Sequence, residues 1–420
     1  DGWHLPRTRL WLDTHSRSGR IRTADIDRYR STSNDIFYAV DDLPEETEAE
    51  PNNGIRGANR VRLPVIVNGR IQTPGDVDVY RFQGRVNDEV VVQVTARRLR
   101  SPLDSLVRLT DVDGNVVAWN DDHVDKQGHL HRGMGVLTHY ADSCLRATLE
   151  RNGSYYVHVS DARGHGSDAH GYRVRISAPR PDFELIVTPA SVTVAAGCSV
   201  LLTAHIRRQD GFDGPVALGL ADAPEGFSLD AARIPAGRES VRLTLQPPAK
   251  PRPEPVVLKV EGRGRVGRHA VVRTAVPAEN CMQAFLWRHL APCRELQVAV
   301  VKRRFRDLPA RLADEDGVEL PAGRHATVTV RTARFPRLDR VQLKLQDPPE
   351  GISLGDVKAG ARELEFELNA DREGPRTGFA DNLIVEAFAD IPWGKDRKQT
   401  RRVSLGVLPA IPLEIVRPWE

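Results

Sequence analysis

The sequence predicts an all-β protein: a jelly-roll-like β-sandwich followed by two tandem immunoglobulin-like β-sandwiches. Short runs rich in valine, leucine, isoleucine and tyrosine recur, and several alternate with polar residues, as strands with one buried face do. Dipeptides that favour tight turns separate these runs, and no long apolar stripe has the 3.6-residue period of a helix. Many short strands joined by Gly and Pro turns are typical of sandwiches and barrels.

The clearest strand patterns are spread over the whole chain. They lie at 90–94, 107–109, 155–159, 172–176, 192–194, 241–245 and 328–330. The clearest turn signals are Asp113-Gly114, Asn152-Gly153, Asp210-Gly211 and Asp316-Gly317.

An internal repeat organises the C-terminal half. The segment 216–226, VALGLADAPEG, aligns with 341–351, VQLKLQDPPEG, and both copies continue with a Ser-Leu pair. Ala-Gly turns before alternating segments match at the same spacing of about 125 residues. Repeats of this length are too long for solenoid units and match the size of an immunoglobulin-like sandwich. We therefore expect two copies of one β-sandwich.

Composition sets the number of domains and excludes some functions. The chain has 420 residues, of which 40% are hydrophobic, so two to four globular domains are expected. The formal net charge is only +3, which argues against a nucleic-acid-binding protein. No run approaches the roughly 20 apolar residues of a membrane span. The chain begins at Asp1 without a signal-peptide pattern, so we interpret it as a processed or excised piece.

Proline-rich segments suggest the domain boundaries. We expect an arm or the tail of a preceding domain at 1–41, a jelly-roll module at 42–180, and sandwiches at 181–278 and 279–420. The Pro-rich stretch 247–255 falls inside the first repeat, and more strand pattern follows it, so it is interpreted as a long loop.

Two acidic clusters carry the best chemical signal. Glu48, Glu50 and Asn52 lie in the first, with Asn53 beside them, and Asp76 and Asp78 lie in the second. Calcium takes about 6–8 oxygen ligands from carboxylates, amides and carbonyls, which are the groups that these residues offer. The alternative is a solvated charge run at 48–50 and a simple turn before a strand at 76–78.

A series of short motifs gives the module a family resemblance. In order they are ExEPNN at 48–53, VNGRI at 67–71, GDxDxYxF at 75–82, LDS at 103–105, DG at 113–114, NDD at 120–122 and GxYxVxV at 153–159. The series resembles the bacterial pre-peptidase C-terminal domain and covers about a third of the chain. With Pro-Asp-Phe at 181–183 and sandwiches behind it, the arrangement is similar to planctomycete-type multidomain secreted proteins.

The resemblance implies a calcium site. Such modules are similar to the collagen-binding domains of clostridial collagenases, jelly-roll sandwiches with calcium at the N-terminal linker. The resemblance assigns calcium binding to Glu48, Glu50 and Asn52 from the linker, and to Asp76 and Asp78 from the start of the following strand. Calcium would then clamp the linker to the sandwich, so that its binding energy becomes folding energy.

Other polar groups favour structural roles. Asp104, Asn120, Asp121, Asp122 and Asp142 could form a second cation site, but an Asx-rich turn explains them better. Histidines 123, 129, 131, 139, 165 and 170 lack metal-ligand spacing and indicate polar loops. Ser105 and His139 could be imagined as a nucleophile and base, yet nothing orients the histidine. No nucleophile elbow or phosphate loop occurs, so the chain is expected not to be an enzyme.

Cysteine and tryptophan leave alternatives open. Cys281 and Cys293 flank a compact apolar stretch and could form a disulfide; otherwise these two, Cys144 and Cys198 are separate buried thiols. A sugar-binding platform would need Trp119, Trp287 or Trp393 at the surface, and Trp393 is the best placed because it follows Pro392 in an expected loop.

The expected function is structural or binding rather than catalytic. We expect an extracytoplasmic segment (secreted, periplasmic or cell-surface) of a larger protein, in contact with a protein or polysaccharide surface or with neighbouring domains. The alternatives are an accessory region that targets a secreted peptidase or other hydrolase, and a carbohydrate-binding module. The sequence does not indicate the oligomeric state.

Overall fold

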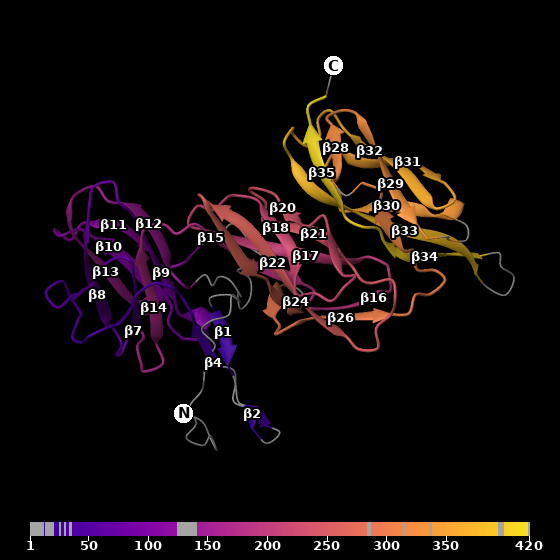
Figure 1. The fold of residues 1–420 in the computed structure, drawn as a ribbon. Helices are drawn as coiled ribbons and strands as arrows, with labels where there is room; N and C mark the ends of the chain where they lie inside the picture. The colour runs from indigo at the N-terminus through magenta and orange to yellow at the C-terminus, as the bar shows by residue number, and fades with distance from the viewer. Residues whose placement is uncertain are drawn as a thin grey trace. The chain divides into compact units, whose positions relative to one another are not determined.

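The computed structural model describes residue 12 and residues 21–24, 27–28, 31–32, 36–123, 141–283, 287–314, 316–333, 335, 338–393 and 399–418. Within these residues the protein is all-β, as the sequence predicts (Figure 1). The only helical elements described are two single 3₁₀ turns, η1 (Arg97–Leu99) and η2 (Leu338–Arg340). No helix in the described part of the chain is long and apolar enough to span a membrane.

The chain forms two compact units. The first contains residues 1–182, 208–212 and 280–291, and the second contains 183–207, 213–279 and 292–420. The boundary at 182/183 lies close to the expected end of the first module at 180.

The first unit contains a sandwich of two five-stranded sheets. One sheet has the order β11 (Val116–Asn120), β10 (Ser105–Thr110), β13 (Gly153–Asp161), β8 (Val77–Gly84) and β6 (Asn59–Arg60). The other has the order β12 (Cys144–Thr148), β9 (Glu89–Thr95), β14 (Gly171–Ser177), β7 (Val65–Arg70) and β5 (Glu45–Thr47). Neighbouring strands are antiparallel except β5 with β7 and β6 with β8, which are parallel.

Alternating side chains from both sheets fill the core of this sandwich. On β8, Tyr80 and Phe82 point inward and are at most 2% exposed, and the ring of Phe82 stacks on that of Tyr155 with 5.8 Å between centroids. Val92 and Val94 on β9, in the opposite sheet, belong to the same core cluster. Burial of this apolar surface is the main favourable contribution to folding.

The described residues of the segment before the module include two pairs of short antiparallel strands. β1 (Ile21–Ala24) pairs with β4 (Ile36–Ala39), and β2 (Asp27–Arg28) pairs with β3 (Ser31–Thr32). The guanidinium of Arg100 lies 4.3 Å from the ring centroid of Phe37. A cation over an aromatic face is attractive, so β4 is attached to the module next to η1.

The remaining strands form two sandwiches that repeat one strand order; these strands belong to the second unit except for residues 182, 208–212 and 280–291, which belong to the first. In the first, one sheet runs β19 (Ser228–Asp230), β21 (Ser240–Gln246), β17 (Val200–Gln209), β15 (Asp182–Thr188), β24 (Val276–Gln283) and β25 (Trp287–Pro292). The other runs β16 (Ser191–Ala195), β26 (Leu296–Val301), β22 (Val256–Val266), β18 (Val216–Ala221) and β20 (Arg233–Ile234), and β23 (His269–Thr274) pairs with β22.

The second copy has matching sheets. One runs β27 (Ala310–Leu312), β29 (His325–Thr332), β32 (Glu363–Ala370) and β31 (Ile352–Ala359). The other runs β28 (Val318–Pro321), β35 (Ile411–Val416), β33 (Ala380–Trp393) and β30 (Gln342–Gln346), with β34 (Gln399–Val407) beside β33. The parallel pair β16–β26 in the first copy corresponds to the parallel pair β28–β35 in the second.

The turns of the repeat are also the same. Asp222 and Asp347 both have positive φ, 50° and 42°, and the glycines of the two Pro-Glu-Gly turns, Gly226 and Gly351, have φ of 90° and 81°. Glycine tolerates this left-handed region because it lacks a Cβ atom. The two copies therefore have the same backbone conformation at turn positions that align in sequence.

Strand pairing places the end of the first sandwich later than the sequence indicated. β26 pairs with β16 and β22 of the first sandwich, so that domain extends to Val301 rather than ending at 278. The hairpin β24–β25 lies between β23 and β26 in the sequence. A domain boundary drawn from the sequence alone therefore left β26 outside the first sandwich. The Pro-rich stretch 247–255 is a loop between β21 and β22, as expected.

Within the second unit, buried polar groups join the two sandwiches. The side-chain amide of Asn382, 4% exposed, donates 2.8 and 2.7 Å hydrogen bonds to the carbonyls of Ala231 and Arg242. The buried hydroxyl of Thr244 accepts a 2.9 Å hydrogen bond from the backbone of Ala410. Because buried polar groups are costly without partners, these bonds fix how the two copies meet.

Candidate metal centre

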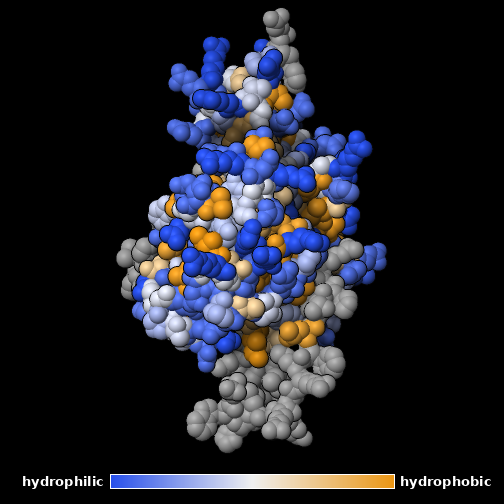
Figure 2. Space-filling view, turned by 90° about the vertical axis from the view of Figure 1, so that its left-hand side faces the viewer, coloured by the Kyte–Doolittle hydropathy of each residue, from blue (hydrophilic) through white to orange (hydrophobic). Residues whose placement is uncertain are grey.

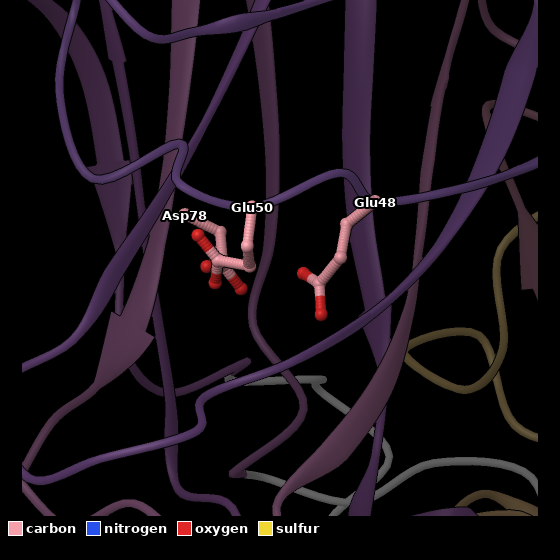
Figure 3. A group of neighbouring side chains, drawn as sticks. All are labelled: Glu48, Glu50 and Asp78. Atoms are coloured by element: carbon pink, nitrogen blue, oxygen red, sulfur yellow. The ribbon is translucent and has the colours of Figure 1, made fainter.

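Three carboxylates converge beside the first sheet of the module. Ligand oxygens of Glu48, Glu50 and Asp78 all lie within 4.8 Å of one another. Figure 3 shows the three side chains pointing into the same space, Glu48 and Glu50 from the segment after β5 and Asp78 from β8. The two acidic clusters of the sequence thus meet in space.

Strand alternation explains why Asp78 is buried. Asp78 lies two residues before Tyr80 and four before Phe82, so it shares the core-facing side of β8. Its side chain is fully enclosed, at 0% exposure. Burial raises the pKa of Asp78 to about 8, and the charge of Glu48 adds to that increase.

Two tyrosines hold the carboxylates from the core side. The Tyr172 hydroxyl donates to Oδ2 of Asp78 at 2.5 Å, and the hydroxyls of Tyr172 and Tyr80 lie 2.6 Å apart. Tyr80 in turn donates to Oε2 of Glu48 at 3.3 Å. Burial raises the pKa values of both tyrosines, so they remain hydrogen-bond donors at neutral pH.

Glu48 is positioned by β7. Its Oε1 accepts a 2.7 Å hydrogen bond from the backbone of Arg70, while its own backbone nitrogen donates to the carbonyl of Asn68 at 3.0 Å. Burial raises the pKa of Glu48 above its usual range. A Cβ atom at Gly69 would lie 2.6 Å from Oε2 of Glu48 and 2.5 Å from the Tyr172 hydroxyl, so glycine makes room for this carboxylate.

Asn52 completes the constellation. It is fully buried, and its side-chain amide has one end 3.1 Å from Oδ1 of Asp78 and 3.2 Å from Oε2 of Glu50. If that end is the amide nitrogen, it donates to both carboxylates. If it is the oxygen, three oxygens face one another, which is favourable only around a cation.

Asp76 lies next to the constellation but has other partners. Its Oδ1 accepts a 2.6 Å hydrogen bond from the side chain of Asn53, and its Oδ2 accepts one from the backbone of Gln72 at 2.8 Å. Its charge helps to raise the pKa of Asp78, which places it close by. Of the five residues assigned to calcium, the structure groups four and gives Asp76 a role in holding the loop before β8.

The donor set fits a hard divalent cation. Carboxylates and one amide oxygen are calcium ligands, whereas no cysteine or histidine belongs to the group. Within the described residues, none of Glu48, Glu50 and Asp78 forms an ion pair with a basic side chain. Carboxylates crowded together without a positive partner repel one another, so a bound cation would relieve that cost.

The second acidic group serves structure instead. Both oxygens of Asp142 accept hydrogen bonds at the η1 turn, including 3.0 and 2.7 Å bonds to Oδ1 from the backbones of Ala96 and Arg97. Arg98 also pairs with Asp142 at 2.7 Å. Asn120 Oδ1 accepts a 2.8 Å hydrogen bond from the backbone of Cys144, 24 positions away, and its side-chain nitrogen donates to the carbonyl of Asp122 within the local turn. These contacts agree with the structural interpretation.

No catalytic arrangement involves Ser105 in the described residues. Ser105 is fully buried, donating to the carbonyl of Ala141 at 3.0 Å and lying 2.9 Å from the Ser143 hydroxyl. His139, together with His129 and His131, lies outside the described residues. His165 is two-thirds exposed, and its backbone nitrogen donates to the carboxylate of Asp161, a loop role.

The structure describes the four cysteines and the exposure of the Trp119 side chain. All four cysteines carry thiols rather than disulfides, and only Cys198 is fully buried. Trp119, on the edge strand β11, is 61% exposed, and Val116 on the same strand is 51% exposed. Trp393 ends β33 rather than lying in a loop, and the side chains of Trp287 and Trp393 lie outside the described set. Figure 2 shows that apolar groups on one face are small and scattered among hydrophilic ones.

The sequence did not identify the residues on other strands that contact and position the carboxylates. Tyr80 stands in the GDxDxYxF motif and could have been included, but Tyr172 lies 94 positions from Asp78 and carries no local signal. Gly69 stands in the VNGRI motif, yet its role appears only when β7, β14 and the linker are placed together.

The comparisons with known proteins found matches among solved structures, at low sequence identity. No family model matches the chain, and no curated protein matches it. Among solved structures, the pre-peptidase C-terminal domain of a Bacillus anthracis collagenase is similar over 33% of this chain and 100% of its own, with 15% identity and a TM-score of 0.20. Domains 4–9 of the surface layer protein SbsC match over 74% of this chain with 12% identity and a TM-score of 0.24, and the match covers 47% of that structure. The eight N-terminal Ig domains of Down Syndrome Cell Adhesion Molecule match over 74% of this chain and 36% of their own, with 10% identity and a TM-score of 0.16.

Proposed function

We propose that this chain is a non-catalytic, extracytoplasmic structural or binding segment whose first module is stabilised by calcium. The observation that carries the proposal is the enclosed Asp78 carboxylate, grouped with Glu48 and Glu50 and without a basic partner in the described residues. Glu48, Glu50 and Asp78, with the amide oxygen of Asn52, would hold the ion. Bound calcium would supply the positive charge that this group lacks.

Calcium binding would tie the entry segment to the sandwich. Glu48 and Glu50 stand on the segment that enters the module, while Asp78 stands on β8 in its first sheet. A cation held by both would oppose separation of that segment from the module, as expected of a rigid spacer in a multidomain surface protein. The two linked sandwiches of the second unit support the same spacer role.

The test is calcium-dependent stability. We expect 2 mM calcium to raise the melting temperature of the first module relative to excess chelator, because a ligand that binds only the folded state stabilises it by mass action. Asp78→Asn should remove this response, whereas Asp168→Asn, at a fully exposed side chain, should retain it. An unchanged melting temperature with millimolar calcium would rule out the calcium role.

The accessory-region alternative leads to a different measurement. If this segment targets a secreted hydrolase, the full-length gene product contains a catalytic domain, and deletion of these 420 residues lowers its activity on insoluble polymer but not on a soluble substrate. A gene product without a catalytic domain supports the spacer role.

A further inference from the structure

A concentration of positive charge lies on one sheet of the first immunoglobulin-like sandwich. Arg233 on β20, three residues on β22 and Arg268 in the turn that follows it are all exposed; the three on β22 are Lys259, Arg263 and Arg265. We call these five residues the basic face. Its one carboxylate within β22 is Glu261. The whole chain carries a net charge of only +3, so this is a local excess.

Strand register sets these side chains on one outward surface. Arg233 and Arg263 lie in one row on either side of Ala217, and Arg265 follows Arg263 by two residues on β22. Gly262, the residue before Arg263, faces the core, because a Cβ atom there would lie 2.3 Å from a methyl of Leu185. Since side chains alternate along a strand, Arg263 and Arg265 both point to solvent.

The cations of the basic face have no acidic partner. Among the described residues, none of Arg233, Arg263, Arg265 and Arg268 forms an ion pair, unlike Arg207 of the same sandwich, which pairs with Glu184 at 3.2 Å. Clustered cations repel one another, and a partner of opposite charge removes that cost. The surface therefore selects an anion.

The outward-facing side chains on the strands next to the cations are small, and none of them is aromatic. The outward positions of the neighbouring strands are Ala217, Gly219 and Ala221 on β18, and Ala270, Val272 and Thr274 on β23. Bases of single-stranded nucleic acid bind by stacking on aromatic side chains, and the centres of protein interfaces are rich in aromatic and large apolar residues. The basic face offers neither, which disfavours nucleic acid and protein as its ligand.

The spacing of the cations suits a repeated anion. Arg233 and Arg263 lie two strand spacings apart, about 10 Å, with β18 between them, and Arg263 and Arg265 are two positions apart along β22, about 7 Å. Guanidinium groups bind carboxylates through paired hydrogen bonds, and a polymer with acidic groups at intervals can engage several at once. A single small anion could use only one or two of them.

We propose that the basic face of the first immunoglobulin-like sandwich binds a linear acidic polysaccharide. The inference rests on the proposed binding role and gives it a ligand class. It uses a different unit of the chain from the calcium centre, so the two can fail separately.

The test uses hyaluronate as a carboxylated polysaccharide, neutral dextran as the uncharged control, and the full chain with 1 mM calcium. Arg263→Thr with Arg265→Thr removes two charges while keeping residues that favour strands. The matched control is Arg311→Thr with Arg331→Thr, two exposed arginines paired across β27 and β29 of the other sandwich. We expect the first pair to raise the Kd for hyaluronate by about tenfold or more and the control pair by less than about twofold, with no binding to dextran.

The outcomes separate the possibilities. Equal loss in both double variants would show that charge alone drives binding and would overturn the proposal. Tighter binding of a single-stranded DNA oligonucleotide than of hyaluronate with the same number of charges would also overturn it. Absence of hyaluronate binding with an intact calcium-dependent rise in melting temperature would sink this inference alone. Loss of that rise with intact hyaluronate binding would sink only the calcium role.

Discussion

The hydroxyl of Tyr172 donates a hydrogen bond to Oδ2 of Asp78, with 2.5 Å between the oxygens, although the residues are 94 positions apart. The other oxygen of Asp78, Oδ1, faces Asn52. One oxygen is therefore fixed by β14 and the other is turned toward Glu50 and the entry segment. A carboxylate oriented in this way joins the core of the sandwich to the segment that enters it.

Loss of the tyrosine hydroxyl should weaken both stability and calcium binding. In Tyr172→Phe, Asp78 loses a buried hydrogen-bond donor, so the free energy of unfolding without calcium should fall by about 1–3 kcal/mol. Urea unfolding with chelator measures this change, and calcium titration measures the affinity. Tyr156→Phe is the matched control, because Tyr156 is nearly as buried on β13 and its hydroxyl has no hydrogen bond to a side chain among the residues that the structure describes. Equal stability of Tyr172→Phe and the unmodified protein would show that the bond contributes nothing.

The metal-free module should lose stability as pH rises from about 4 to about 8. The pKa of Asp78 is raised from 3.8 to about 8 in the folded protein, so across this window the unfolded chain has released the proton that the folded chain still holds. Unfolding is therefore favoured progressively more as pH rises, and the penalty is absent below pH 4. Glu48, whose pKa is also raised, adds in the same direction.

Melting temperatures with chelator at pH 5 and pH 8 measure this dependence. Asp78→Asn should flatten it, because the amide has no proton to release. Asp42, whose pKa is lowered to about 2 by Arg180, destabilises the folded state only on acidification below pH 4 and does not interfere. Calcium should stabilise the module more at pH 8 than at pH 5, since the ion competes with the proton on Asp78. The opposite order would contradict the assignment of Asp78 as a ligand.

Gly69→Ala should disturb the site through steric pressure alone. The added methyl group would lie 2.5 Å from ring atoms of Tyr172 and 2.6 Å from Oε2 of Glu48, so one of these side chains must move. We expect a loss of about 1–3 kcal/mol of stability and weaker calcium binding, measured by urea unfolding and calcium titration. Gly54→Ala is the control, because no atom lies within 4 Å of its Cβ position. If both variants behave alike, Gly69 has no special role.

Asn382→Ala should loosen the connection between the two repeated sandwiches. It removes two donors from the buried carbonyls of Ala231 and Arg242, and unsatisfied buried acceptors cost about 1–3 kcal/mol. Urea unfolding should show a lower midpoint or separate transitions for the two sandwiches. Ser353→Ala, at an exposed position on β31, should leave the single transition unchanged. A variant that unfolds like the unmodified protein would show that this amide does not hold the joint.

The class of the fold and much of the carboxylate cluster proposed to bind calcium follow from local sequence. Turn pairs such as Asp210-Gly211 require positive φ, both residues adopt it, and the strands between turns follow the predicted alternation. Glu48, Glu50 and Asp78 were identifiable because they lie in two short motifs on neighbouring segments. The repeat of 125 residues indicated two copies of one domain before their sheets could be compared.

Tertiary structure alone determined which distant residues meet. The last strand of the first sandwich, β26, is assigned to that domain by hydrogen bonds to β16 and β22, and a linear boundary at 278 could not anticipate pairing across an inserted hairpin. Asp76 and Asp78 are two residues apart, but Asp76 lies just before β8 and its carboxylate holds the preceding loop, whereas Asp78 lies on β8 and faces the core. Burial raises the pKa of Asp78, and this burial arises only when the two sheets of the sandwich pack together, which a sequence does not show.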